Sequence, residues 1–190
     1  GETKLALDDI LLEAEEKMDN AVRILTDEFR TIRTGVASPS LVEGIKVDCY
    51  GTTCPVKQVG TIGAPDPRQL VIRPFDRNVL GDIERAILKS DLGLTPNNDG
   101  KMIRIPIPPL SEERRRQLAT RLREMAEEAR VSIRNVRRDA NKQIDQEQKD
   151  GEIPEDNAFK GKDDVQELTK EYEEKVDKAV ETKSTEVMEV

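Results

Sequence analysis

Arginine side chains dominate the stretch of the chain between residues 114 and 138. Nine arginines and three acidic residues give this stretch a local charge of +6, whereas the whole chain of 190 residues carries a formal net charge of −8. At about 100° per residue on a helix, five of the arginines project within a band about 60° wide. These five residues, named here the arginine stripe, are Arg116, Arg123, Arg130, Arg134 and Arg137.

The chemistry that such a stripe supports is the binding of phosphate. An arginine guanidinium is planar and donates two parallel hydrogen bonds to a phosphate group. The basic residues of this stretch are overwhelmingly arginine rather than lysine. The stripe therefore predicts a helix that contacts a nucleic-acid backbone and recognises its shape rather than its sequence.

A second interpretation is a solvated helix face whose arginines pair with acidic residues of other helices, as charge runs commonly do. The three acids of this stretch are Glu124, Glu127 and Glu128. They precede residues 130–138, so we expect the arginines there to remain almost unpaired within their own helix. This spacing favours phosphate binding and leaves the pairing interpretation open.

Other residue types give little support to an enzyme. The chain has no histidine, which removes the most frequent general base and metal ligand. The sequence has no Gly-rich phosphate loop, and spacing singles out no pair of carboxylates for acid–base catalysis. Cys49 and Cys54 lack a second Cys or His pair that would complete a zinc site, so we expect two reduced cysteines in strands. We therefore predict no catalytic residue, no metal site and no cofactor.

Three segments have the apolar spacing of long amphipathic helices. The first covers residues 5–32, where apolar residues recur at every seventh position. The second opens with Ser111 as its N-cap and continues past Ile144. The third runs from about residue 163 to residue 188, after a polar connector over residues 150–163. Three helices with one apolar face each predict a three-helix bundle.

The segment between the first two helices has a different composition. It contains nine of the ten prolines and several short runs of β-branched residues. A helix is expected over residues 77–93, with Gly93 as its terminator. The predicted strands are residues 44–50, 56–62, 69–75 and 101–108.

Together these elements predict an α+β chain with two domains. A long three-helix bundle is formed by residues 1–34 and 109–190, and a small β/α/β domain, residues 35–108, is inserted into it. Two short joints connect the domains, so a hinge is possible. The candidate hinge residues are Thr34, Gly35, Val36, Pro108 and Pro109.

The sequence gives no sign of a membrane protein. No apolar run approaches the roughly 18 to 20 residues of a spanning helix. The N-terminus has no basic region followed by an apolar stretch. We therefore expect a cytoplasmic protein without membrane contact, and we expect a monomer.

Three motifs stand out along the chain. They are IRTGVASPS at residues 32–40, SDLGLTPNNDGKMIRIPIPPLSEERR at 90–115 and ARVSIRNVRRDAN at 129–141. Together they closely resemble the bacterial ribosome recycling factor family. The resemblance implies a three-helix bundle with an inserted αβ domain in an L-shaped outline like that of tRNA. It also implies a factor that binds the large ribosomal subunit after termination and, with elongation factor G and GTP, separates the ribosome into subunits.

The resemblance also assigns roles to individual residues. The family's ribosomal RNA contacts lie on the arginines of its RNxRR segment, and Arg33 in the RTG segment is a weaker match. The family usually continues RTG with a basic residue, whereas this chain has Val36. The predicted ribosomal RNA interface consists of Arg134, Arg137, Arg138, Arg130, Arg123 and Arg33.

Two functions of other kinds also fit parts of the pattern. A structural helical adaptor that binds an acidic protein would use the stripe as a charged docking face. An RNA-binding chaperone would share the stripe but would not need the hinge.

Overall fold

The computed structural model describes residues 2–188, with side chains described from residue 6 onward. The described chain divides into two compact units, residues 2–33 with 112–188 and residues 34–111. The first unit is built from long helices and the second from strands and one main helix. The chain is therefore α+β, as predicted.

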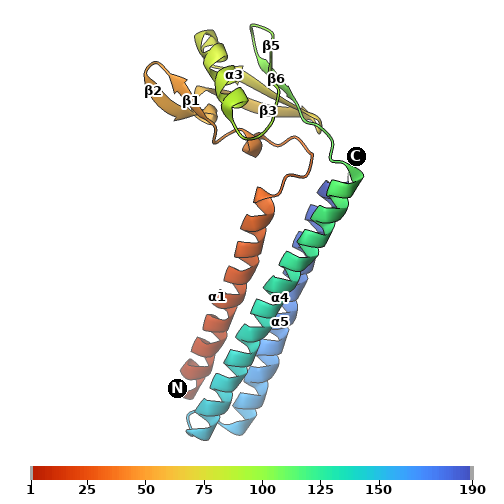
Figure 1. Cartoon of the computed structure of the whole chain (residues 1–190). Helices are drawn as coiled ribbons and strands as arrows, with labels where there is room; N and C mark the ends of the chain where they lie inside the picture. The colour runs from red at the N-terminus through yellow and green to blue at the C-terminus, as the bar shows by residue number, and fades with distance from the viewer. Residues whose placement is uncertain (1, 189–190) are drawn as a thin grey trace. The chain divides into compact units, whose positions relative to one another are not determined.

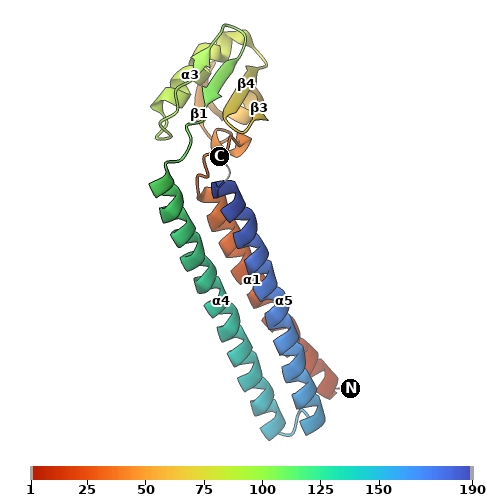
Figure 2. The same cartoon turned by 90° about the vertical axis from the view of Figure 1, so that its right-hand side faces the viewer.

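The first unit is a bundle of three long helices. They are α1 (Glu2–Thr31), α4 (Glu112–Lys149) and α5 (Glu155–Met188), and they run side by side (Figure 1 and Figure 2). Apolar residues at helical spacing fill the space between them, and each fully buried large apolar side chain contributes about 1.5 to 3 kcal/mol. The most deeply buried of these are Met18, Leu25, Leu122, Ile133, Ile144, Val165 and Val176.

The predicted start of the last helix is wrong. Helix α5 begins at Glu155, because Pro154 precedes it and acidic Glu155 and Asp156 favour a first helical turn. Gly161, which we took as part of a polar connector, lies buried inside the helix. A Cβ atom at this position would meet Leu7 Cδ1 at 2.5 Å, so the glycine allows α5 to pack closely against α1.

The second unit contains two small antiparallel sheets. Strands β1 (Lys46–Cys49) and β2 (Thr52–Pro55) form a hairpin that places both free cysteines in strands, as predicted. The larger sheet has the strand order β3-β4-β6-β5. Its strands are β3 (Gly60–Asp66), β4 (Gln69–Pro74), β5 (Asn97–Asn98) and β6 (Ile103–Pro106).

Two predicted elements of this unit need correction. The segment expected to be a strand from residue 56 begins as a helical turn, α2 (Val56–Val59), before β3 starts. Helix α3 (Leu80–Lys89) ends before Gly93, because Ser90 takes an extended conformation and caps the helix. Gly93 instead lies in the following turn with a φ of 66°. Short 3-10 turns η1 (Pro39–Leu41) and η2 (Arg77–Val79) complete the unit.

One face of the larger sheet is buried in the core of the unit. Strand β6 alternates buried and exposed residues, and β4 is fully buried at Leu70 and Ile72. These side chains lie in one cluster with buried residues of α3, including Ile83 and Ile87. The opposite face of the sheet carries the exposed members of the same strands.

Both ends of the second unit are fixed to the β3–β4 hairpin. Ala37 donates a backbone hydrogen bond to Pro67 O, and Ile107 donates one to Arg68 O, both at 2.8 Å. Gly35 has a φ of 72°, and a Cβ there would lie 3.0 Å from Leu110 Cγ. The two joining segments therefore lie against each other within this unit.

Candidate nucleic-acid interface

Helix α4 carries every member of the arginine stripe. Glu112 and Glu113 lie in its first turn, where acidic side chains stabilise the positive end of the helix dipole. Leu122 and Ile133 are fully buried in the bundle. The arginines occupy the positions between these apolar residues and the solvent-facing side, so the stripe follows the length of the helix.

Arg130 and Arg134 are paired with acids of α5 and, contrary to our prediction, also with Glu127 of their own helix. Arg130 donates to Asp177 of α5 at 2.6 Å and to Glu127 at 3.4 Å. Arg134 donates to Glu173 of α5 and to Glu127, both at 3.1 Å. Hydrogen bonds to the two α5 carboxylates are the main cause that raises the pKa of both guanidinium groups above the ordinary value. For these two residues the pairing interpretation is correct.

The geometry of two antiparallel helices explains these pairs. Residues four apart on one helix lie on the same face one turn apart. Arg130 and Arg134 on α4 therefore meet Asp177 and Glu173 on α5 in reverse order. The acids lie in a helix far along the chain, so the spacing within α4 could not show them.

Arg137 and Arg138 differ from these two residues. Arg137 donates to the side-chain oxygen of Gln166 at 3.4 Å, and that amide carries no charge. Arg138 is exposed. Among the residues that the structure describes, neither arginine forms an ion pair with a carboxylate. Their charges are therefore available to an outside anion.

The other predicted residues lie nearer the start of α4. Arg123 is exposed and has no ion pair within the described part of the chain, whereas Arg116 pairs with Glu112. Arg33 is exposed and follows α1, whose C-terminal end lies near the start of α4 (Figure 1). At about 1.5 Å per residue, Arg134 lies roughly 33 Å further along α4 from Glu112. The structure thus brings Arg134, Arg137 and Arg138 together and leaves Arg33 apart from them.

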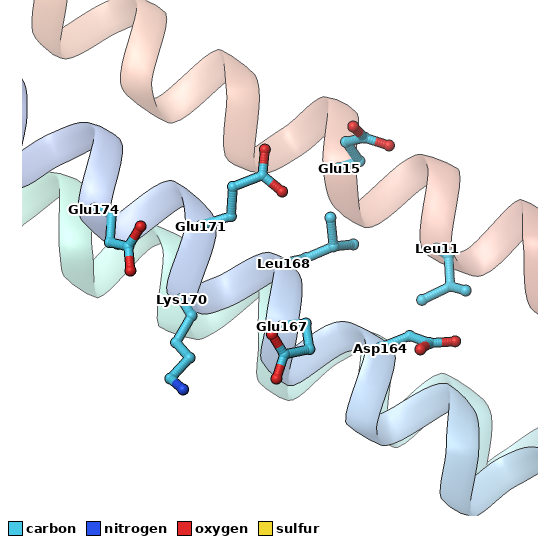
Figure 3. Close-up of a pocket in the computed structure, with 8 residues that line it drawn as sticks. All are labelled: Leu11, Glu15, Asp164, Glu167, Leu168, Lys170, Glu171 and Glu174. Carbon is cyan, nitrogen blue, oxygen red and sulfur yellow. The ribbon is translucent and has the colours of Figure 1, made fainter.

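A groove between α1 and α5 has the opposite charge. Figure 3 shows its carboxylates around Leu11 and Leu168, and the groove encloses about 530 Å³. It is lined by Leu11, Glu15, Asp164, Glu167, Leu168, Lys170, Glu171 and Glu174. Sequence reasoning missed this groove, because its residues come from two helices that the whole second unit separates along the chain.

Two further kinds of site were expected to be absent. No group of three or more His, Cys, Asp or Glu side chains among them is arranged to hold a metal ion. Among the helices of residues 2–188, none could span a membrane. The exposed arginines of α4 are therefore the strongest candidate site.

Comparison with known proteins gives a consistent family assignment. The family model described as ribosome recycling factor matches residues 25–188. The ribosome-recycling factor of Nitratidesulfovibrio vulgaris (strain DP4) is 52% identical over 184 residues, which cover 97% of this chain and 99% of the relative. That of Carboxydothermus hydrogenoformans is 50% identical over 184 residues, covering 97% of this chain and all of the relative.

Solved structures agree with this assignment. A solution structure of a ribosome recycling factor has a TM-score of 0.75 and 44% identity, and covers 97% of this chain and 98% of its own. A model of the T. thermophilus ribosome recycling factor has a TM-score of 0.64 and 39% identity over 96% of this chain and 99% of its own. That model is described together with E. coli elongation factor G, bound to the E. coli post-termination complex.

Proposed function

Because this chain belongs to the ribosome recycling factor family, we propose that it binds the ribosome after termination and, with elongation factor G and GTP, separates it into subunits. The proposed first contact is with RNA of the large subunit. The chain acts as a monomer in the cytoplasm and without a catalytic residue of its own, since GTP hydrolysis belongs to the partner.

The observation that carries this proposal is the uncompensated charge of Arg137 and Arg138. Each lies on the surface of α4 without a carboxylate partner among the described residues, and Arg123 extends the same property toward the start of the helix. A guanidinium that has no internal acid gains most from a phosphate ligand. Arg130 and Arg134 contribute by their position beside this pair, although α5 carboxylates share their hydrogen bonds.

The proposed mechanism is mechanical. The bundle, residues 1–34 and 109–190, is held on ribosomal RNA while the inserted domain, residues 35–108, turns about the joints under the action of elongation factor G. Gly35 supports this role because its positive φ suits glycine and strains other residues. Thr34, Val36, Pro108 and Pro109 complete the proposed hinge.

Co-sedimentation with large ribosomal subunits at rising salt tests the anchoring contact. The variant Arg137→Glu/Arg138→Glu should bind much more weakly, and the slope of log K against log salt should fall in magnitude by about 2, because two phosphate contacts are lost. Its far-UV circular dichroism should match that of the parent chain. The matched control is Arg30→Glu, since Arg30 is an exposed arginine of α1 paired with Asp27.

Two results would contradict the proposal. Binding of the double variant with unchanged affinity and salt slope would show that these arginines do not contact the ribosome. A mixture of post-termination ribosomes, elongation factor G, GTP and the parent chain that yields no free subunits would contradict the recycling activity itself. An adaptor for an acidic protein would then become the better explanation of the stripe.

A further inference from the structure

The second unit has a surface that the proposed function does not use. The outward side chains of the larger sheet, named here the open face, cover the side away from the apolar core. Antiparallel pairing places Thr61 opposite Arg73, and Val71 between Gly63 and Arg104. The open face consists of Thr61, Gly63, Asp66, Gln69, Val71, Arg73, Asn97 and Arg104.

Phe75 extends the open face beyond the end of β4. Its backbone N–H donates to Val59 O, at the end of α2, at 2.9 Å, next to the Gly60–Pro74 pair. Because β4 is extended up to Pro74 and side chains alternate along a strand, we expect the Phe75 side chain on the same side as Arg73. The ring is 70% exposed, although burying a phenylalanine is normally favourable. Successive side chains on this row are roughly 6.6 Å apart.

The charge of the open face is positive and incompletely balanced. The side chain of Arg73 is exposed and forms no hydrogen bond or ion pair with another described residue. Arg104 has only a long contact with Asp99, at 3.8 Å, in which both side chains are about half exposed. Arg73 and Arg104 are diagonal neighbours on adjacent strands, about 7 to 8 Å apart. An anion between the two guanidinium groups would relieve their mutual repulsion.

Three acidic side chains lie near these strands. Asp99 has the long contact with Arg104, and Asp76, which follows Phe75, accepts hydrogen bonds from the Tyr50 hydroxyl and the Asn78 N–H. Asp66 pairs with Gln69 at the β3–β4 turn, and its carboxylate accepts the Arg68 N–H at 2.8 Å. Gln69 and Arg73 are four residues apart, which is roughly 13 Å along the strand. Arg73 therefore has no carboxylate partner among the described residues, and both Asp76 and Asp99 already accept other hydrogen bonds.

From this arrangement we infer that the open face binds single-stranded RNA. One base stacks on the ring of Phe75, and Arg73 and Arg104 contact the adjoining phosphates. Stacking is available to every base and requires an unpaired strand, so the site accepts single strands without sequence preference. An acidic polypeptide would satisfy the arginines but would give the exposed ring no flat partner. This second RNA site is independent of the arginines of α4.

The test uses the full chain carrying Arg137→Glu/Arg138→Glu, so that RNA binding by α4 is reduced. Fluorescence anisotropy with a labelled twelve-residue oligouridylate at low salt measures affinity. Adding Phe75→Ala or Arg73→Glu should weaken binding about tenfold each. Phe75→Trp should retain the affinity because it keeps a stacking surface, whereas Phe75→Leu should lose it.

Two control variants match these changes. Phe159→Ala removes a phenylalanine of equal exposure, 71%, from α5. Arg85→Glu reverses an exposed charge on α3 that is paired with Asp82. Neither should alter oligouridylate binding, and circular dichroism should confirm that every variant is folded. An RNA duplex should bind Phe75→Ala and its parent equally.

Several results would overturn the inference. One is an affinity that Phe75→Leu leaves intact, because stacking would then play no part. Another is equal weakening by Phe75→Ala and Phe159→Ala. A third is that Arg73→Glu loses affinity for polyglutamate but keeps its affinity for oligouridylate. That result would assign the open face to an acidic protein. Loss of ribosome binding in the α4 variant does not affect any of these measurements.

Discussion

The close packing of α5 on α1 at Gly161 can be tested by adding one methyl group. A Cβ at this position would lie 2.5 Å and 3.3 Å from the two Cδ atoms of Leu7, and 3.4 Å from Ile144 Cδ1. Replacing glycine by alanine inside a helix contributes about 1 kcal/mol of stability. Overpacking a filled site costs about 1 to 3 kcal/mol. Gly161→Ala should therefore lower the free energy of unfolding by about 0 to 2 kcal/mol.

A double-mutant cycle separates the two contributions. In a Leu7→Ala background the close contact is absent, so Gly161→Ala should raise the free energy of unfolding by up to about 1 kcal/mol. The coupling energy between the two positions should be about 1 to 3 kcal/mol. Urea unfolding followed by far-UV circular dichroism suits this measurement, because three long helices of the bundle dominate the signal.

Gly81 provides the control for helix propensity. It lies near the start of α3, and a Cβ there has no atom within 4 Å. Gly81→Ala should be neutral or stabilising in either background, with no coupling to Leu7. If Gly161→Ala stabilises the chain equally with and without the Leu7 side chain, then the reasoning about close packing is refuted.

Three further perturbations follow from particular contacts. Glu173→Gln removes the carboxylate that competes with RNA for Arg134. The affinity for large ribosomal subunits, measured by co-sedimentation, should therefore rise a few-fold. An unchanged or lower affinity would contradict this competition. The hydrogen bond from the Tyr50 hydroxyl to Asp76 raises the pKa of Tyr50 above its ordinary value of 10.0. This bond stabilises the fold below pH 10.0, and the stabilisation is lost as the pH rises through the folded-state pKa. Asp76→Asn should therefore lower the pH at which one tyrosine ionises in ultraviolet absorbance, and no shift would refute the bond. Gly35→Pro forces φ from 72° to about −65°, so subunit separation should fall more than ribosome binding; an equal loss of both would indicate misfolding.

The long helices were predictable because their apolar residues recur at helical spacing over many turns. That signal depends on local periodicity alone, and the bundle follows from the need to cover three apolar faces. The start of α5 was missed because Gly161 has the residue type of a loop. Its actual role is close contact with Leu7, which lies at the other end of the sequence. Cys54 was expected in a strand, but the bounds of β2 were missed because Thr-Thr-Cys-Pro has no alternation of apolar and polar residues.

The candidate site was predictable only in part for a related reason. The spacing of arginines along α4 gave the stripe and its direction. It could not distinguish Arg134, which Glu173 holds, from Arg138, which is exposed without an ion pair in the described structure. That distinction depends on the pairing register of two antiparallel helices. The register is set by side-chain packing over the whole bundle, and no local pattern encodes it.

The acidic charge of the bundle limits which of its faces can contact RNA. Carboxylates that line the groove between α1 and α5 repel a phosphate backbone, whereas Arg137 and Arg138 on α4 attract it. A nucleic acid that approaches the bundle therefore meets one favourable face and one unfavourable face. Glu173 and Asp177 lie at the border between them and tie Arg134 and Arg130 to α5. A net charge of −8 is thus compatible with RNA binding, because repulsion elsewhere on the bundle limits the orientations in which RNA can dock.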